Sequence, residues 1–335
     1  MAAAPAASNR TASSYRKAVP GAARQNGSLD ELMTIGREGR TVAHNGVMDF
    51  PTGAFLTALG CSLAAVALVM AGSFVIGKST GKYSIIDAIW GPGFAVIAVV
   101  AFLVSLGNGD PTLRWLVLAM VVVWGLRLGG YILFRNKGLP EDPRYQEMLA
   151  DANGPGVIVR KVQVPQGLTM WFVSLPVQLA MVLPGPAGWV IWLGLAVYLV
   201  GLFFEAVGDG QLAAFKKDPA NKGKLMDRGL WRYTRHPNYF GDACVWVGIF
   251  LTVSWTWVGW LTILSPVLMI WLLTAKTGKA LTERRMSSSR PGYADYVART
   301  SGFFPLPPKK SQPKKSPPKK SQPKKSPPKK LRSTG

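Results

Sequence analysis

The sequence predicts an all-α, polytopic integral membrane protein with about seven transmembrane helices. Three observations lead to this class. First, 48% of the 335 residues are hydrophobic although the formal net charge is +22, and these two properties are segregated along the chain. Second, several apolar windows reach the ~20 residues that a helix needs to cross a bilayer. Third, a dense polar motif at residues 235–242 stands where one of these windows begins.

The apolar windows define the predicted spans in chain order. They cover residues 54–77, 83–106, 115–134, 162–183, 187–204, 239–258 and 259–275. The last two are joined so tightly that either could be a kinked or re-entrant piece. The predicted count therefore holds to about one span.

Positive charge alternates between the connections and predicts the orientation. The loops after the first, third and fifth windows, and the segment after the last, carry most of the Lys and Arg residues. Because cytoplasmic loops carry an excess of Lys and Arg, we expect these loops and the C-terminus to be cytoplasmic. An odd number of spans then leaves residues 1–48 outside, with Arg37 and Arg40 close to the first window, whereas an even number removes this conflict.

Both ends of the chain read as disordered segments around a membrane-embedded domain at residues 49–305. Residues 1–48 hold few large apolar groups, so we expect no packed core there. Residues 306–335 repeat Pro and paired Lys, and ten lysines with Arg332 give them half of the net charge. Such a tail is extended and solvated. Contact with anionic lipid is favoured over nucleic-acid binding, because the tail is tethered beside a basic membrane face.

A basic loop at residues 207–237 carries aromatic side chains. Its cations are Lys216, Lys217, Lys222, Lys224, Arg228, Arg232 and Arg235, and its aromatic neighbours are Trp231, Tyr233 and Tyr239. Arg and Lys suit phosphates, and aromatic faces suit a nucleotide ring. The combination fits a dinucleotide such as NADPH, although ordinary cytoplasmic charge bias also makes such loops basic.

His236 strengthens the cofactor interpretation. Pro237 disfavours helical geometry at His236, so the next helix is expected to begin at Asn238 and Tyr239. Free N–H groups at a helix start beside a histidine and an arginine favour anions. The alternative is an interfacial residue that caps a helix. Glycine-rich nucleotide motifs of soluble folds are missing from the sequence, which argues against a Rossmann domain.

Three motifs resemble the steroid 5-alpha-reductase family and the related sterol C14 and C7 reductases. They are Glu205-x-x-x-Asp209-x-Gln211-Leu212, then Arg228-Gly229-Leu230-Trp231, and then Arg235-His236-Pro237-Asn238-Tyr239-Phe240-Gly241-Asp242. The closing segment Glu283-Arg284-Arg285, followed by Tyr293-x-x-Tyr296 and Phe303-Phe304-Pro305, also matches. Ser84-Ile85-Ile86-Asp87 and Glu141-Asp142-x-Arg144-Tyr145 look most like a bacterial branch.

The resemblance implies an all-helical membrane fold, in a bacterial cell membrane, with NADPH bound on the cytoplasmic side. It also implies reduction of a carbon–carbon double bond in a lipid or steroid, with enoyl, isoprenoid and fatty-acyl substrates open. The implied cofactor residues are Asp209, Lys216 (or Lys217), Arg228, Trp231, Arg235, His236, Asn238, Tyr239 and Asp242, with Glu283 and Tyr296 closing over the cofactor.

The reaction requires a protein acid as well as a hydride. Candidates are Asp87, Glu205 and Tyr239, with Asp242 beside them. A buried carboxylic acid is held neutral by desolvation, which favours proton donation. Asp87 could instead pack helices together. Arg127, inside the third window, is expected to pair with Asp87 or Glu205, unless it extends to the cytoplasmic face.

Two other functions compete with the reductase. Isoprenylcysteine carboxyl methyltransferases, which use S-adenosylmethionine, share an Arg-His-Pro-x-Tyr-x-Gly segment and a late acidic residue. Methyl transfer requires no proton donor and little phosphate-binding charge, so the seven cations favour the reductase. A non-enzymatic membrane protein that recruits partners through its tail leaves the polar motif at residues 235–242 without a role.

Overall fold

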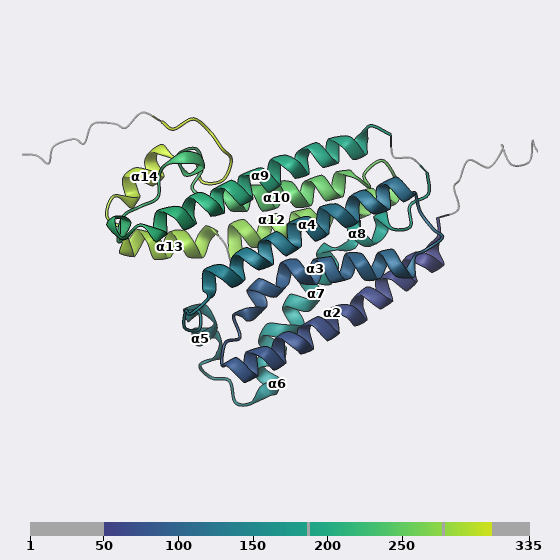
Figure 1. Cartoon of the computed structure of the whole chain (residues 1–335), viewed down its shortest axis with the longest axis horizontal. Helices are drawn as coiled ribbons and strands as arrows, with labels where there is room; N and C mark the ends of the chain where they lie inside the picture. The colour runs from purple at the N-terminus through teal and green to yellow at the C-terminus, as the bar shows by residue number, and fades with distance from the viewer. Residues whose placement is uncertain (1–49, 186–187, 277–278, 310–335) are drawn as a thin grey trace, which may run out of the picture. The chain divides into compact units, whose positions relative to one another are not determined.

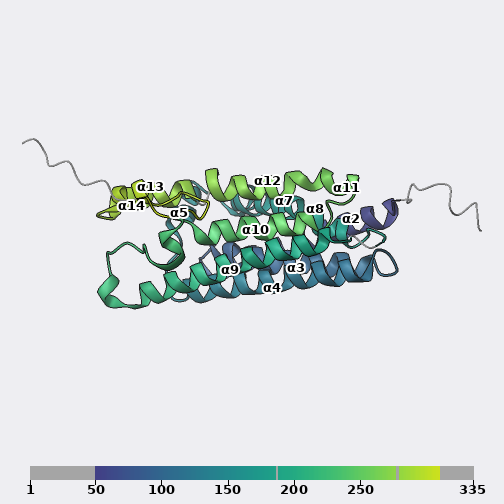
Figure 2. The ribbon, with the colours of Figure 1, turned by 90° about the horizontal axis from the view of Figure 1, so that it is seen from above.

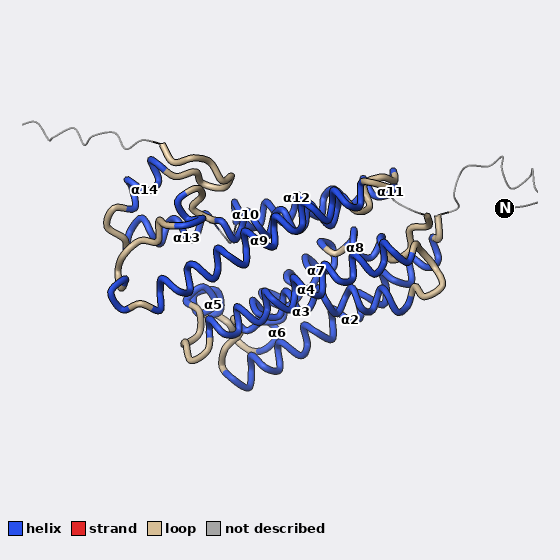
Figure 3. The backbone as a smooth tube through the Cα atoms, turned by 45° about the horizontal axis from the view of Figure 1, so that its top comes forward, coloured by secondary structure: helices blue, strands red, loops and turns tan. Residues whose placement is uncertain are grey.

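The computed structural model describes residues 50–185, 188–276 and 279–309, which are helices and loops throughout (Figures 1 and 3). Among these residues, the one β-type contact printed is an isolated parallel bridge between Thr234 and Ser301. The predicted all-α class is confirmed for this part of the chain. The predicted N-terminal segment at residues 1–48 and the tail beyond residue 309 lie outside the described residues.

The helices follow one another with short connections. They are α2 (Thr52–Thr80), α3 (Ile85–Val104), α4 (Pro111–Asn136), α5 (Pro143–Leu149), α6 (Pro155–Ile158), η1 (Val159–Gln163), α7 (Val164–Val173), α8 (Leu175–Ala180), α9 (Val190–Lys217), η2 (Pro219–Asn221), η3 (Gly229–Arg232), α10 (Pro237–Leu251), α11 (Trp257–Trp260), η4 (Leu261–Ile263), α12 (Leu264–Trp271), η5 (Leu272–Lys276), α13 (Lys279–Ser289) and α14 (Tyr293–Arg299).

Within residues 50–185, 188–276 and 279–309, five helices are long and apolar enough to cross a bilayer, as an integral membrane protein requires. They are α2, α3, α4, α9 and the stretch Trp257–Ala275. The predicted count of about seven is therefore not confirmed in the described part of the chain. The window at residues 162–183 is divided among η1, α7 and α8, with a break at Ser174, and α10 has 15 helical residues, fewer than the ~20 that span a membrane.

Glycines allow α9 and α10 to pack backbone against backbone. Figure 2 shows the two helices side by side. A Cβ on Gly201 would lie 2.5 Å from the Gly241 carbonyl oxygen, and a Cβ on Gly248 would lie 2.6 Å from the Gly194 oxygen. Small residues permit such approach between membrane helices. The contact places the last turns of α9 beside the first turns of α10, where the polar residues of both helices meet.

The opposite half of the bundle packs on α3 and α4 in the same way. A Cβ on Gly91 would lie 2.2 Å from the Gly125 oxygen. Between the halves, the rings of Phe94, Trp124 and Trp246 form a buried aromatic core, with centroids 4.4–5.7 Å apart. Short helices α5, α13 and α14 gather at the end of the bundle where α9 ends and α10 begins (Figure 1).

Candidate functional site

A buried acid cluster joins α4, α9 and α10. We use this name for Arg127, Glu205, Asp209 and Asp242. The Arg127 guanidinium forms ion pairs with Glu205 and, at 3.1 Å, with Asp209. The Glu205 side chain is 3% exposed, and its Oε2 also accepts a hydrogen bond of 2.8 Å from Trp124 Nε1. Of the two partners expected for Arg127, Asp87 and Glu205, the structure shows Glu205.

Asp242 differs from the other two carboxylates of the acid cluster. Its Oδ1 is buried and has no hydrogen-bond partner among the described residues. The Arg127 Nε and the Trp246 Nε1 are likewise buried without a hydrogen-bond acceptor among the described residues. Glu205 Oε2 accepts from Trp124 and its Oε1 is ion-paired with Arg127, while Asp209 accepts from Arg127 and Asn238. Asp242 Oδ1 is therefore a buried carboxyl oxygen of the cluster without a hydrogen-bond partner among the described residues.

A second cluster closes the C-terminal segment over the start of α10. We call Arg235, His236 and Glu283 the Glu283 clamp. Arg235 donates to Glu283 Oε1 from Nε at 3.0 Å and from Nη2 at 2.8 Å, and its Nη1 donates to the Thr300 carbonyl at 2.6 Å. The Arg235 backbone N–H donates to the Ser301 carbonyl. In this arrangement Arg235 holds helices α13 and α14 in place, and its donors are already engaged.

Both His236 and Glu283 have a lowered pKa in the clamp. Burial lowers the pKa of His236 below its usual value, against the influence of Glu283. Burial alone would raise the pKa of Glu283, but the hydrogen bonds from His236 and Arg235 lower it to about 2. A carboxylate only accepts hydrogen bonds, so the His236 Nε2 at 3.1 Å carries the proton. The clamp thus consists of a neutral histidine and an ionised glutamate at neutral pH.

Asn238 connects the clamp to the acid cluster. Its Nδ2 donates to Asp209 Oδ1 at 3.3 Å, and its Oδ1 accepts from the Tyr239 backbone N–H at 3.1 Å. The Tyr239 ring is stacked on His236, with centroids 5.2 Å apart and planes 7° apart. The helix α10 begins at Pro237, one residue before the predicted start at Asn238, so Asn238 and Tyr239 lie in its first turn and His236 is its N-cap residue. Asn238 is thus bonded to the acid cluster, and the neighbouring Tyr239 ring contacts the clamp through His236.

The remaining predicted cofactor residues lie on α9, on the loop between α9 and α10, and on α14. Trp231 Nε1 donates to the Gly208 carbonyl at 3.0 Å, and Tyr296 Oη donates to the Trp231 carbonyl at 2.5 Å. Lys216 and Arg228 are exposed. Gln211 lay in a recognised motif without a predicted role; its Oε1 accepts from the Leu230 N–H beside Gly229, whose φ is +57°. The loop between α9 and α10 is therefore fixed against α9 while its cations remain accessible.

Asp87 belongs to a separate group at the start of α3. Its carboxylate pairs with Arg144 at 2.7 Å and accepts from Tyr145 Oη at 2.6 Å. Gln166 Nε2 donates to the same hydroxyl at 3.3 Å, and Gln166 Oε1 accepts from Trp90 Nε1. Burial and the Asp87 charge raise the pKa of Tyr145, which keeps the phenol protonated. Sequence reasoning assigned no role to Tyr145 or Gln166, and Gln166 is a polar residue inside an apolar window.

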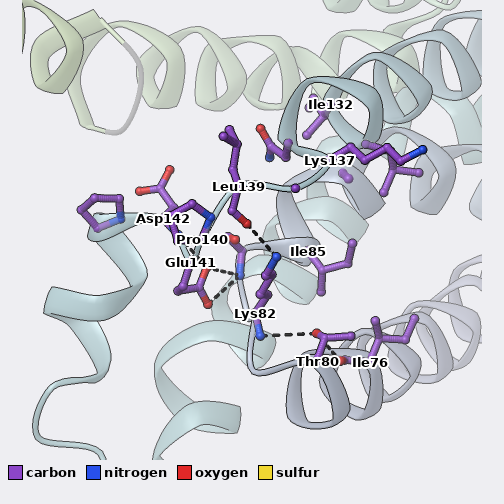
Figure 4. A pocket seen from close by; sticks show the side chains of 16 residues that line it. Ile76, Thr80, Lys82, Ile85, Ile132, Lys137, Leu139, Pro140, Glu141 and Asp142 are labelled. Carbon is purple, nitrogen blue, oxygen red and sulfur yellow. Dashed lines mark hydrogen bonds between the residues drawn. The ribbon is translucent and has the colours of Figure 1, made fainter.

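A cavity of about 620 Å³ adjoins this group, between the ends of α2, α3 and α4 and the loop before α5 (Figure 4). Glu141 accepts from the Ser84 N–H at 3.1 Å, and Lys82 Nζ donates to the Leu139 carbonyl at 2.6 Å. A second cavity, of about 410 Å³, lies between α2 and α7. Neither of these two cavities is lined by a predicted cofactor residue.

Comparison with known proteins identifies the family. A family model described as "Protein of unknown function (DUF1295)" matches residues 73–300. The chain belongs to the DUF1295 family. This family contains steroid 5-alpha-reductase-like proteins, so the resemblance expected from the motifs is confirmed. No solved structure matches this DUF1295 chain.

Three curated relatives match short parts of this DUF1295 chain. The chain is 32% identical over 72 residues to "Steroid 5-alpha-reductase DET2" of Arabidopsis thaliana, and 32% identical over 71 residues to the protein of that name from Gossypium hirsutum. Each match covers 21% of this chain and 27% of the relative. The "Probable O-methyltransferase ustE" of Ustilaginoidea virens is 46% identical over 46 residues, which are 14% of this chain and 16% of the relative. The matches thus span about a quarter or less of these relatives.

The Glu283 clamp predicts an acid-sensitive C-terminal segment. Because the pKa of Glu283 is lowered from 4.5 to about 2, its stabilising contribution is complete above about pH 4.5 and is lost as the pH falls toward 2. The lowered pKa of His236 acts in the same direction, since protonation below about pH 6.5 favours the unfolded state. We expect Glu283→Gln to cost about 1–2 kcal/mol at pH 7, because its charged hydrogen bonds become neutral ones.

The measurement is thermal unfolding of the detergent-solubilised chain as a function of pH. Between about pH 4.5 and 2, the variant should lose less stability than the wild type. Glu147→Gln, at an exposed position of α5, is the matched control and should follow the wild-type curve. Parallel acid curves for Glu283→Gln and the wild type would contradict the clamp.

Proposed function

We propose that this chain is a membrane-bound, NADPH-dependent reductase of a carbon–carbon double bond in a lipid or steroid-like substrate. The observation that carries the proposal is the position of Asn238. Its amide bonds to Asp209 in the buried acid cluster and to the first turn of α10, where Tyr239 stacks on His236. A cationic, aromatic surface is thereby joined to buried acids, and a reductase needs both. Similarity to two plant steroid 5-alpha-reductases supports the same class of reaction.

The side chains fit a dinucleotide in two respects. Lys216 and Arg228 are exposed cations in the same stretch of the chain as the aromatic residues Trp231 and Tyr239, a combination that suits phosphates next to a ring. The buried Asp242 Oδ1 and Trp246 Nε1 lack partners in the described chain, and a carboxamide can both donate and accept hydrogen bonds. When bound, NADPH supplies the hydride. Arg235 holds Glu283 and the C-terminal segment, and Tyr296 holds Trp231.

We assign the proton to Asp242 rather than to the three acids that the sequence favoured. Three carboxyl groups in the acid cluster face one guanidinium, and Arg127 pairs with Glu205 and Asp209. Buried carboxyl groups that outnumber their cations keep a proton, because like charges at short range are not ionised together. The three groups that the sequence favoured have other partners: Glu205 pairs with Arg127, Asp87 pairs with Arg144, and the Tyr239 ring stacks on His236.

The proposal also assigns an orientation of the chain in the membrane. The cations of the loop between α9 and α10 face the cytoplasm of a bacterial cell, following the charge asymmetry of the loops. The substrate reaches the reacting atoms from the bilayer, as its apolar character requires. Contact of the tail beyond residue 309 with anionic lipid is proposed on its charge alone.

The alternative is an S-adenosylmethionine-dependent methyltransferase of the isoprenylcysteine carboxyl methyltransferase type. The observation in its favour is the 46% identity over 46 residues with a probable O-methyltransferase. Methyl transfer moves no hydride and needs no proton donor, so it gives no role to the Asp242 carboxyl group, whose Oδ1 is buried without a hydrogen-bond partner among the described residues. Asp242 therefore favours the reductase.

Ligand-dependent unfolding of the full chain in detergent tests the proposal. A ligand at ~100 times its dissociation constant stabilises its protein by about 2.7 kcal/mol. We expect this stabilisation with NADPH and not with S-adenosylmethionine. Arg228→Gln should reduce it, whereas Arg160→Gln, at an exposed position of η1, should not. Stabilisation by S-adenosylmethionine alone would replace the reductase with the methyltransferase.

A further inference from the structure

An apolar groove of about 410 Å³ lies between α2 and the segment η1–α7. We call it the α2–α7 groove. Twelve residues line it, none of them charged, and Gln163 is the one polar side chain among them. Its volume falls within the ~300–1,000 Å³ of small-molecule sites. The rim is exposed where a bilayer would contact the helices, for example at Val75 and Leu168.

The floor of the groove is built by close contacts. Val66 and Met70 of α2 are buried, and they approach Gly167 of α7 so closely that a Cβ there would lie 3.0 Å from Met70 Cγ. Gln163 ends the π-helical turn η1 and is 4% exposed. Such turns inside α-helices occur frequently at functional sites. The turn therefore brings an amide to the floor of a groove that is otherwise apolar.

The Gln163 amide is only half satisfied. Gln163 Oε1 lies 2.8 Å from Ser73 Oγ, which also lies 2.9 Å from the Met70 carbonyl, and Gln163 Nε2 has no partner among the described residues. Ser73 has one hydroxyl proton. If Ser73 donates that proton to the Met70 carbonyl, the Gln163 amide is flipped so that its Nε2 donates to Ser73 Oγ, and the Gln163 Oε1 is then the atom without a partner. In either orientation one buried polar atom of Gln163 requires a partner, which otherwise costs about 1–3 kcal/mol.

We propose that the α2–α7 groove binds an uncharged lipid that carries a hydroxyl group. A hydroxyl both donates and accepts, so it satisfies the Gln163 amide in either orientation. The absence of charge among the twelve lining residues excludes an ionised headgroup from the groove. The site goes beyond the proposed function, because it involves no cofactor residue, and its α2 wall up to Ala71 precedes residue 73, where the family match begins.

Photolabelling of the full chain in phospholipid nanodiscs tests this site. The probe is a long-chain alcohol with a diazirine and an alkyne tag, and the matched probe has the same chain ending in a methyl group. We expect labelling by the alcohol to map to α2 and to the segment η1–α7, and to be competed by unlabelled alcohol. Gln163→Leu should weaken the competing affinity about fivefold, which corresponds to about 1 kcal/mol.

Gln178→Leu is the matched control. Gln178 is fully buried in α8 and also has an amide oxygen without a partner, but it does not line the groove. It should leave the labelling unchanged. If Gln163→Leu does not fold, Ala71→Phe, which fills the groove and keeps the amide, should abolish the labelling. Equal labelling by both probes, or labelling that Ala71→Phe leaves intact, would show that bulk acyl chains occupy the groove and would overturn the proposal. No dinucleotide or turnover enters the assay, so the outcome is independent of the proposed reductase.

Discussion

Replacing Arg127 with leucine is expected to destabilise the folded protein by about 3–5 kcal/mol, the cost of leaving buried charges without their partner. The side chains of Glu205 and Asp209 are 3% and 5% exposed, and Arg127 is the cation with which both pair. Trp124 and Asn238 each retain one hydrogen bond to these acids, but neither carries a charge. Thermal unfolding in detergent at neutral pH measures the loss.

Arg135→Leu is the matched control for this prediction. Arg135 lies two turns further along α4, is exposed and donates to Asn136, so its loss should cost less than about 1 kcal/mol. The double variant Arg127→Leu/Glu205→Leu should recover part of the stability, because replacing a buried pair with apolar residues is often neutral. Equal unfolding temperatures for Arg127→Leu and Arg135→Leu would contradict the pairing.

The sequence predicts the helices that depend on long apolar runs. The windows at residues 54–77, 83–106 and 115–134 correspond to α2, α3 and α4 within a few residues. The window at residues 187–204 stops at Glu205, but α9 continues to Lys217. An apolar window ends at the first charged residue, whereas a helix continues as long as its backbone hydrogen bonds are made. The charged end of α9, which carries the candidate site, is therefore the part that a hydropathy window misses.

The partners of the polar residues depend on contacts that no local pattern records. Arg127 was expected to pair with Asp87 or Glu205, and the structure gives it Glu205. Asp87 instead meets Arg144, 57 positions away, because Glu141 holds the loop before α5 against the start of α3. The sequence shows that intramembrane ions need partners. Which partner each one takes depends on how distant segments, such as the loop before α5, pack against the helices.

Asp242→Asn is expected to lower turnover by about 10²- to 10⁴-fold, the usual contribution of a general acid. Asparagine has nearly the same shape but no acidic proton to give to the substrate carbon. Binding of NADPH should persist, because the exposed cations and the Glu283 clamp are unchanged. Consumption of NADPH in the presence of a lipid extract from the native membrane measures turnover, and unfolding in the presence of NADPH measures binding.

The Glu205→Gln variant distinguishes the effect of losing the ion pair from the effect of losing the proton donor. Glutamine can still accept from Trp124, but it weakens the pairing with Arg127, so this variant should lose stability as well as activity. Asp242→Asn should lose activity while its unfolding temperature changes little, because Asp242 Oδ1 has no partner to lose among the described residues. Turnover within threefold of the wild type in Asp242→Asn would assign the proton to another group. Since the single Arg127 guanidinium balances only one of the two carboxylates with which it pairs, the next candidates would be Glu205 and Asp209.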